Sequence, residues 1–376
     1  MTAIEALQRS GYKRVGTPKR GFRYQGAPAR ELKRIHEIRV PPAWTEVAVA
    51  RSSSARLQAI GKDKKGRWQY RYSAEAVRER EERKFEKLVA FGSALPKLRS
   101  AIDRGLSQKG LTRERVMACI LRILSTCFMR SGSEVYAKEN GSFGIATLQN
   151  RHATVVGDVV RFHYRGKSGK EQLRELKDRR VARIVRELKK LPGKDLFQYV
   201  AEDGHIVNVS RAMINDAVKE AMGESFNAKD FRTWAGTLIA ASTLARLNAE
   251  AVPGVTDRKK LLTAAIKETA AQLGNTPAVC KSSYVWHSVP RSFLQGTVVK
   301  SYFKNMDELV ECKSHGRLAC ENALLELLKE GKVKPRVAKA VAKAVARRPR
   351  APLTKMSRRM QRDPQARRLA KAFAVH

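Results

Sequence analysis

Acidic residues are scarce in this chain compared with basic ones. It has 36 Asp and Glu against 76 Lys and Arg in 376 residues, which gives a formal net charge of +40. An excess of this size predicts a polyanionic partner: nucleic acid first, with an anionic membrane surface as the alternative. Apolar residues still make up 43% of the sequence, which is enough for a real core. The length allows roughly two to three domains.

Long hydrophobic runs and paired cysteines are also missing. No stretch of about 18 apolar residues occurs, so no transmembrane helix is expected. The amino terminus lacks the basic-then-apolar pattern of a signal peptide. None of the five cysteines belongs to a Cys-x-x-Cys pair, which argues against a disulfide framework and a zinc site. We therefore expect a cytoplasmic location, on the nucleoid if the source is bacterial.

Motifs for nucleotide and metal chemistry are not found either. The chain has no Gly-x-x-x-x-Gly-Lys-Ser/Thr loop for the phosphates of ATP. It has no cluster of carboxylates of the kind that holds two metal ions in a nuclease. The sequence thus predicts an activity without a cofactor.

Composition and periodicity divide the chain into four parts. Residues 1–35 are basic and Gly-rich and are expected to be a weakly ordered lead-in, and residues 36–78 are expected to form a small β domain and a hinge. Residues 79–331 are mostly helical in pattern. Residues 332–376 are low-complexity and rich in Lys, Arg and Ala, which is typical of a tail that adds DNA affinity independent of sequence. The predicted fold class is α+β.

Local patterns place strands and helices within these parts. Residues 45–49 alternate with period two, and residues 67–72 follow a turn, so both are expected to be strands. Apolar residues recur at helical spacing over 112–128. Residues 153–164 read as a hairpin, and residues 165–170 as a second tight turn, which together predict a β insert in the helical domain.

The most informative stretch is residues 273–284. Gly274 is placed to stop one helix, and Thr276 and Pro277 have the N-cap and first-residue pattern of the next. Tyr284 would then lie two turns into that helix. A tyrosine here suits covalent attack on a phosphodiester, because a phenolate leaves again more readily than an alkyl alkoxide.

Three upstream cations complete a candidate site for phosphodiester chemistry. Arg130 and Arg232 suit the non-bridging oxygens, since a guanidinium matches phosphate geometry and keeps its charge. Lys167, in the second turn, suits protonation of the leaving oxygen, because neighbouring cations lower a lysine pKa. Lys170 is the nearest alternative to Lys167.

These motifs, in this order, resemble those of type IB DNA topoisomerases, especially the small poxvirus and bacterial branch. The likeness covers roughly residues 36–310. It is carried by four motifs and one amino-terminal segment: residues 128–148, Gly166–Lys167, Lys229–Trp234, Gly274–Tyr284, and Gln69 with Tyr70 and Tyr72.

The resemblance implies a role for each candidate catalytic residue. Tyr284 would attack the phosphate and form a 3′-phosphotyrosine, while Arg130 and Arg232 stabilise the transition state. Lys167 would protonate the 5′-oxygen. Asn275 stands where many members have His; it can still donate to a phosphate oxygen, but it cannot be charged.

The resemblance also implies a partner and an architecture. Double-stranded DNA would be relaxed by nicking, rotation and religation, without ATP or metal, by a monomer shaped as a C-shaped clamp. The residues that would contact DNA are Gln69, Tyr70, Tyr72, Tyr136 and Lys229.

Other readings of the same residues stay open. A tyrosine recombinase shares the nucleophile, but that family usually has His-x-x-Arg where this chain has Lys229 and Arg232. A non-enzymatic DNA-compaction protein would account for the charge and the tail. Gln69 and its neighbouring tyrosines could simply pack the β domain, and His287 is the one nearby His that could replace the missing one.

Overall fold

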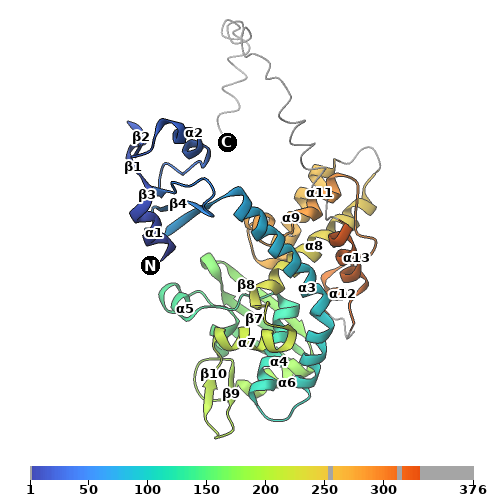
Figure 1. Cartoon of the computed structure of the whole chain (residues 1–376). Coiled ribbons are helices and arrows are strands. Elements are labelled where there is room, and N and C mark those ends of the chain that lie inside the picture. The colour runs from blue at the N-terminus through green and yellow to red at the C-terminus, as the bar shows by residue number, and fades with distance from the viewer. Residues whose placement is uncertain (1, 253–256, 311–315, 331–376) are drawn as a thin grey trace, which may run out of the picture. The chain divides into compact units, whose positions relative to one another are not determined.

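The computed structural model describes residues 2–252, 257–310 and 316–330 (Figure 1). It contains a small β-rich amino-terminal domain followed by a mainly helical domain with small sheets, which confirms the predicted α+β class. The predicted basic tail over 332–376, and Cys312 among the cysteines, lie outside the described residues.

The amino-terminal domain is built on a five-stranded antiparallel sheet. Its strand order is β2-β1-β3-β4-β5. The strands are β1 (Tyr12–Thr17), β2 (Gly21–Gln25), β3 (Thr45–Val49), β4 (Leu57–Lys62) and β5 (Trp68–Tyr72). The strands predicted over 45–49 and 67–72 are thus confirmed as β3 and β5.

Two short helices contribute apolar side chains to the cores of this sheet. Helix α1 (Ala3–Ser10) contributes Leu7, which clusters with Ala48 and Ile60. Helix α2 (Ala29–Glu37) contributes Ile35, which clusters with strand residues of alternate register, among them Val47 and Val49. Because successive side chains of a strand point to opposite faces, the two clusters lie on opposite sides of the sheet.

The expectation of weak order over residues 1–35 was wrong. These residues form α1, β1, β2 and most of α2, and Thr2 and Glu5 form a capping box at the start of α1. The buried residues Leu7, Tyr12 and Ile35 lie far apart from one another among polar, charged and small residues, so no long apolar run marked them in the sequence. Long-range packing against β3 and β4 orders this segment.

The helical domain begins with α3 (Ala74–Leu106), a 33-residue helix capped by Ser73. The hinge expected at the end of the 36–78 segment can therefore include no more than the junction at Ser73, because residues from Ala74 onward are already helical. The helix predicted from the periodicity over 112–128 is present as α4 (Arg113–Cys127), and Thr112 is its N-cap. Helix α5 (Glu134–Asn140) follows it.

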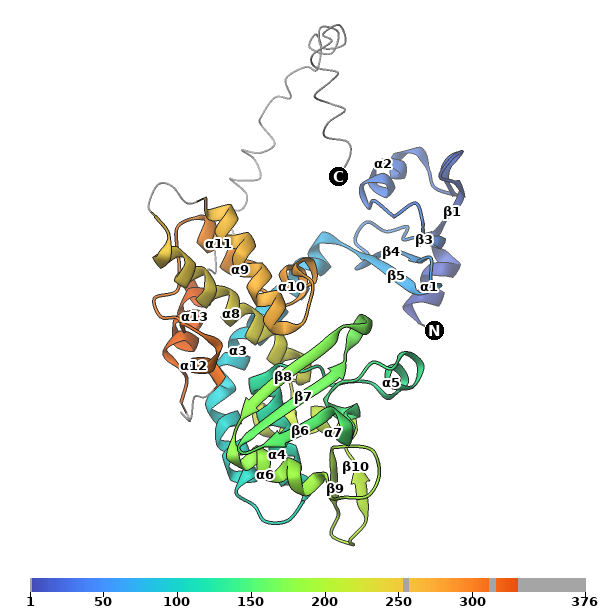
Figure 2. The same cartoon turned by 180° about the vertical axis from the view of Figure 1, so that it is seen from behind.

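The predicted β insert is present as a three-stranded antiparallel sheet (Figure 2). It consists of β6 (Ala153–Val156), β7 (Val159–Arg165) and β8 (Glu171–Lys177). One face buries Val160, Phe162 and Leu176 in the core of the domain, and the other face is exposed. A two-stranded sheet of β9 (Gln198–Val200) and β10 (Ile206–Asn208) was not predicted.

The remaining helices enclose one large apolar core. Helix α8 is the longest of them and is buried along most of its length, and it packs against α3 and α9. Aromatic rings of α3 and α8 meet there, with Phe91 edge-on to Phe231 at 5.2 Å between centroids. The helices are α6 (Arg179–Leu188), α7 (Arg211–Met222), α8 (Ala228–Glu250), α9 (Arg258–Leu273), α10 (Pro277–Ser283), α11 (Ser288–Leu294), α12 (Met306–Val310) and α13 (Ala319–Glu330).

Candidate active site

Arg130 lies on an irregular segment just after α4. The helix ends at Phe128, whose φ of 51° is left-handed and turns the chain sharply. The next residues are held by a neighbouring loop, since Ile145 N–H donates to the Arg130 carbonyl at 2.9 Å and Ala146 N–H to that of Ser131 at 2.9 Å. Gly144 is needed for this contact, because a Cβ there would lie 2.7 Å from the Arg130 carbonyl oxygen.

Arg232 is a buried cation in the second turn of α8, only 3% exposed. Its guanidinium donates to the Phe128 carbonyl and, at 2.8 Å, to the Leu273 carbonyl. It therefore ties the ends of α4 and α9 to α8. Burial, and then the charge of Arg130, lower the pKa of Arg232 from its ordinary value. An arginine retains its proton despite such a shift, so the site keeps a desolvated positive charge.

Tyr284 lies beside this charge. Helix α10 ends at Ser283, so Tyr284 is the C-cap of α10 and lies at its end, beyond the last helical residue. The Arg232 guanidinium carbon is 4.8 Å from the centroid of the Tyr284 ring. The Tyr284 carbonyl accepts a 3.1 Å hydrogen bond from Thr237 on α8, and Gly236 permits this approach because a Cβ there would lie 2.8 Å from that carbonyl.

The pKa of Tyr284 is lowered from its ordinary value. Burial alone would raise this pKa, but attraction and hydrogen bonding by Arg232 outweigh it, with further attraction from Arg130 and Lys229. The phenolate, which is the nucleophilic form, is thus favoured where the candidate nucleophile lies.

Asn275 joins the cluster from the turn before α10. Gly274 ends α9 with a φ of 61°, and Thr276 caps α10 with Pro277 as its first residue, as predicted. The Asn275 side-chain oxygen accepts from the guanidinium of Arg130. Its Nδ2 is buried and, within the described residues, has no hydrogen-bond partner. A buried donor left free beside two arginines suits an anionic ligand.

Four of the five predicted catalytic residues therefore lie together. Arg130 is hydrogen-bonded to Asn275, and the Arg232 guanidinium faces the Tyr284 ring. Arg232 also donates to the carbonyl of Phe128, two residues before Arg130, and is close enough to Arg130 for that charge to lower its pKa. Lys167 is not part of this cluster. It lies in the tight turn between β7 and β8, is exposed, and makes no side-chain hydrogen bond or ion pair with the other described residues. Lys170, the alternative candidate for the proton donor, is also exposed in this turn.

Two side chains close in sequence to these residues, Asp230 and His287, contact other groups. Asp230 bonds to the Asn227 backbone and to Lys87 at 2.7 Å, while Arg232 bonds to carbonyls instead. The ring of His287 packs against Trp286 at 4.3 Å between centroids. Lys229 is exposed at the start of α8 and contributes to the pKa of Tyr284.

The predicted DNA-contacting aromatics are exposed. Tyr70 and Tyr72 on β5 are stacked on each other with 6.2 Å between centroids and are 41% and 43% exposed. These rings are therefore not core residues of the β domain. Gln69 is held by Asp63 at 3.0 Å, and Tyr136 on α5 is 62% exposed. Their part in DNA binding stays a prediction.

Sequence reasoning missed Gln172 and Arg174 on β8. The two side chains are bonded to each other, with Arg174 Nη2 donating to Gln172 Oε1 at 3.0 Å. Both lie against Gly274, next to Asn275. The alternation of Gln172, Arg174 and Leu176 is typical of one face of a strand. No pattern in the neighbouring sequence indicates that this face contacts Gly274.

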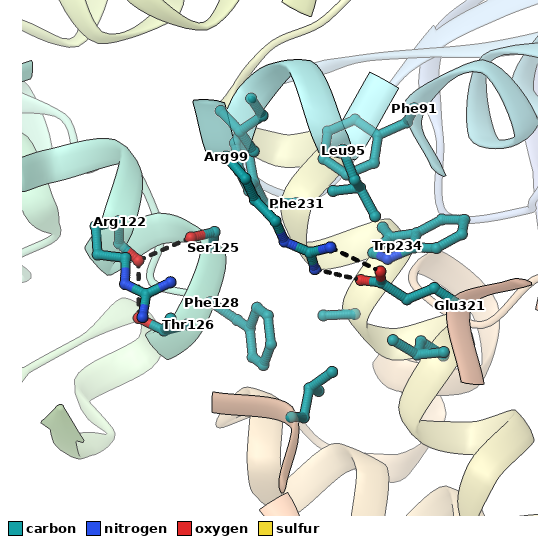
Figure 3. Close-up of a pocket in the computed structure, with 14 residues that line it drawn as sticks. Phe91, Leu95, Arg99, Arg122, Ser125, Thr126, Phe128, Phe231, Trp234 and Glu321 are labelled. Atoms are coloured by element: carbon teal, nitrogen blue, oxygen red, sulfur yellow. Dashed lines mark hydrogen bonds and ion pairs between the residues drawn. The ribbon is translucent and has the colours of Figure 1, made fainter. Parts of the chain in front are cut away.

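A cavity of about 40 Å³ lies between α3, α4 and α8, and Phe128 and Phe231 are among the residues that line it (Figure 3). Arg99 and Glu321 form a two-pronged ion pair at its wall, at 2.8 and 3.0 Å. The cavity has room for a few water molecules, since one needs about 10–15 Å³. The cavity is too small for a nucleotide.

Three further features of the described part of the chain bear on function. It has no cluster of three or more candidate metal ligands. None of its helices is both long and apolar enough to cross a membrane. Cys119, Cys127, Cys280 and Cys320 are free and buried, as expected without a disulfide framework, and burial raises the pKa of the Cys280 thiol to about 11.

Two family models match this chain. One, described as the catalytic core of eukaryotic DNA topoisomerase I, matches residues 73–316. The other, described as the N-terminal domain of bacterial DNA topoisomerase IB, matches residues 21–63. Together they span both domains of the fold.

Curated relatives carry the same family name. DNA topoisomerase 1B of Acanthamoeba polyphaga mimivirus is 37% identical over 261 residues, which cover 68% of this chain and 78% of the relative. DNA topoisomerase I of Monkeypox virus is 24% identical over 267 residues, covering 69% and 80%. DNA topoisomerase 1 of Rabbit fibroma virus is 24% identical over 262 residues, covering 68% and 79%. The chain belongs to the type IB DNA topoisomerase family.

Proposed function

We propose that this enzyme relaxes supercoiled DNA by cutting and resealing one strand through Tyr284. The observation that carries the proposal is that the buried guanidinium of Arg232 lies 4.8 Å from the centroid of the Tyr284 ring. Arg130, which is hydrogen-bonded to Asn275, adds its charge to the same site. These groups supply a favoured phenolate and several donors for one phosphate.

Each step follows from the chemistry of these groups. The Tyr284 oxygen, having lost its proton, attacks the phosphorus, and the bond from phosphorus to the 5′-oxygen breaks. Arg130, Arg232 and the free Nδ2 of Asn275 bind the non-bridging oxygens as their charge grows in the transition state. Lys167 gives a proton to the 5′-oxygen as it leaves, so the free strand ends in a hydroxyl.

Resealing is the same reaction in reverse. The 5′-hydroxyl attacks the phosphotyrosine, returns its proton to Lys167, and releases the Tyr284 phenolate. The number and type of bonds are conserved, so the cycle needs no ATP, and the cations that would otherwise come from a metal are supplied by arginine. The duplex rotates about the intact strand between the two steps. Since only one strand is cut, one active site is enough, and the enzyme acts as a monomer in the cytoplasm.

Relaxation of plasmid DNA tests this function. We expect the wild-type protein to relax both positively and negatively supercoiled plasmid in EDTA without ATP, and Tyr284→Phe to bind DNA but relax neither. DNA binding without relaxation by the wild type, over a range of salt concentrations, would favour a compaction protein instead. Joined products from two duplexes carrying candidate sites would point to a recombinase.

A further inference from the structure

One side chain, Gln172 on β8, connects the Lys167 turn to the Asn275 turn. It is 4% exposed, and every polar atom of its amide is bonded. Its Nε2 donates to the Glu171 carbonyl at 3.0 Å and to the Lys170 carbonyl at 3.4 Å. Its Oε1 accepts from Arg174 at 3.0 Å. A buried amide with all partners satisfied has a fixed position.

On one side, Gln172 holds the turn that carries Lys167. The Lys170 carbonyl accepts from both Gly166 N–H, at 2.8 Å, and the Gln172 amide, so the two ends of the turn are closed on one oxygen. The Gln172 stem packs on Gly166, the residue before Lys167, because a Cβ there would lie 2.7 Å from Gln172 Cγ.

On the other side, Gln172 lies directly against Gly274. A Cβ on Gly274 would be 2.2 Å from Gln172 Oε1 and 2.8 Å from Arg174 Nη2. The backbone of Gly274 also needs glycine, since its φ is 61°. The next residue is Asn275, which bonds to Arg130. Gln172 therefore packs between the segment of the candidate proton donor and that of the candidate phosphate ligands.

We propose that Gln172 is a positioning residue, itself held in place by its hydrogen bond with Arg174. Through its turn it would place the ammonium of Lys167 next to the phosphate that the two arginines and Asn275 bind. This rests on the proposed function, in which Lys167 protonates the leaving 5′-oxygen. Lys167 is exposed and has no bond of its own among the described residues, so the backbone of its turn decides where its ammonium lies. A misplacement of about 1 Å can slow such a step by about a hundredfold.

The test compares DNA strands with oxygen or sulfur at the 5′-bridging position of one mapped cleavage site. A thiolate leaves without a proton, so a defect in proton donation disappears with sulfur, while a defect in phosphate binding does not. We expect Gln172→Ala to cleave the oxygen strand about tenfold to a hundredfold more slowly than wild type in single-turnover reactions. It should cleave the sulfur strand at close to the wild-type rate, because proton donation no longer limits that reaction.

Three reference variants make the result interpretable. Leu173→Ala changes an exposed side chain, 67% accessible, on the same strand and should match wild type on both substrates. Asn275→Ala should be slow on both, because its role is toward the phosphate. Lys167→Ala should be slow on oxygen and recover on sulfur, and if it does not recover, the proposed role of Lys167 fails whatever Gln172 does.

Suppose that sulfur restores the cleavage rate of Lys167→Ala. The positioning role of Gln172 is then wrong if Gln172→Ala cleaves both substrates equally slowly, or if it cleaves both at the wild-type rate. Gln172→Glu guards against a folding defect, since it keeps the size of the side chain and the acceptor for Arg174 but loses the two N–H donors. It should show the same selective loss on oxygen as Gln172→Ala, and equal rates with wild type would likewise overturn the proposal.

Discussion

At the scale of single residues, the site depends on how the buried guanidinium of Arg232 is hydrogen-bonded, because burying a charge without hydrogen-bond partners is costly. Two backbone carbonyls, of Phe128 and Leu273, accept from it, and no carboxylate does so among the described residues. These carbonyls accept from its two Nη groups without cancelling its charge, and its buried Nε has no partner among the described residues. The positive charge therefore remains available to the Tyr284 phenol and to a phosphate.

The pH dependence of cleavage should report this charge. In the proposed mechanism Tyr284 attacks as the phenolate, and Arg232, Arg130 and Lys229 lower the pKa of its phenol. The rate should therefore rise with pH and level off below the ordinary tyrosine pKa. Removing one cation, as in Lys229→Gln, should raise the Tyr284 pKa and move this rise to higher pH. Single-turnover cleavage at saturating DNA measures it.

Lys281→Gln is the matched control for that measurement. Lys281 is exposed on α10 and is not among the groups that shift the Tyr284 pKa. Its profile should coincide with that of wild type, whereas coincidence of the Lys229→Gln profile with both would contradict the electrostatic account.

The free Nδ2 of Asn275 leads to a second prediction at this scale. Asn275→Asp keeps an acceptor for Arg130 but replaces the free donor by a negative charge. We expect cleavage to fall by about a hundredfold or more, the usual effect of losing one donor to a developing oxyanion. Asn275→His, which restores a donor, should remain active, and equal rates for the two variants would exclude Asn275 as a phosphate ligand.

At the scale of elements, α13 is integral to the helical domain although it lies beyond the residues matched by the topoisomerase family model. Its Leu324 and Leu328 are fully buried in the core. Glu321, 2% exposed, pairs with Arg99 on α3, and one of its oxygens also accepts from Leu318 N–H at 2.9 Å.

Glu321→Ala should therefore lower the free energy of unfolding by about 3–5 kcal/mol, because it leaves the largely buried Arg99 without its carboxylate, with only the Gly316 carbonyl as acceptor among the described residues. Glu326→Ala, at an exposed position on the same helix, should change it by less than about 0.5 kcal/mol. Chemical denaturation of both variants measures the difference, and a loss below about 1 kcal/mol for Glu321→Ala would show that α13 is held by its leucines alone.

The elements that the sequence predicted are those with local signals. Gly274, Thr276 and Pro277 mark a stop, a cap and a first turn within four residues, and the structure confirms all three. The ordering of residues 1–35 and the contact of Gln172 with Gly274 depend on residues far apart in the chain, so no local pattern could reveal them. The end of α10 before Tyr284 was missed because no residue near it breaks a helix.

At the scale of the whole molecule, the net charge of +40 should make DNA binding strongly dependent on salt. Residues 332–376 contain a single acidic residue, Asp363. Deleting this tail should weaken binding and flatten the plot of log affinity against log salt concentration, since fewer counterions are released. Cleavage by the saturated enzyme should not change, and an unchanged slope would show that the tail does not bind DNA.

The most direct test of the central claim is the chemistry of the covalent intermediate. A duplex with one mapped cleavage site is labelled at either end of the cut strand, and the reaction is stopped with detergent. We predict that only the 5′-end label becomes attached to protein, through a 3′-phosphate on Tyr284, and that the released strand bears a 5′-hydroxyl. Attachment of the 3′-end label, or an adduct that persists in Tyr284→Phe, would contradict the account.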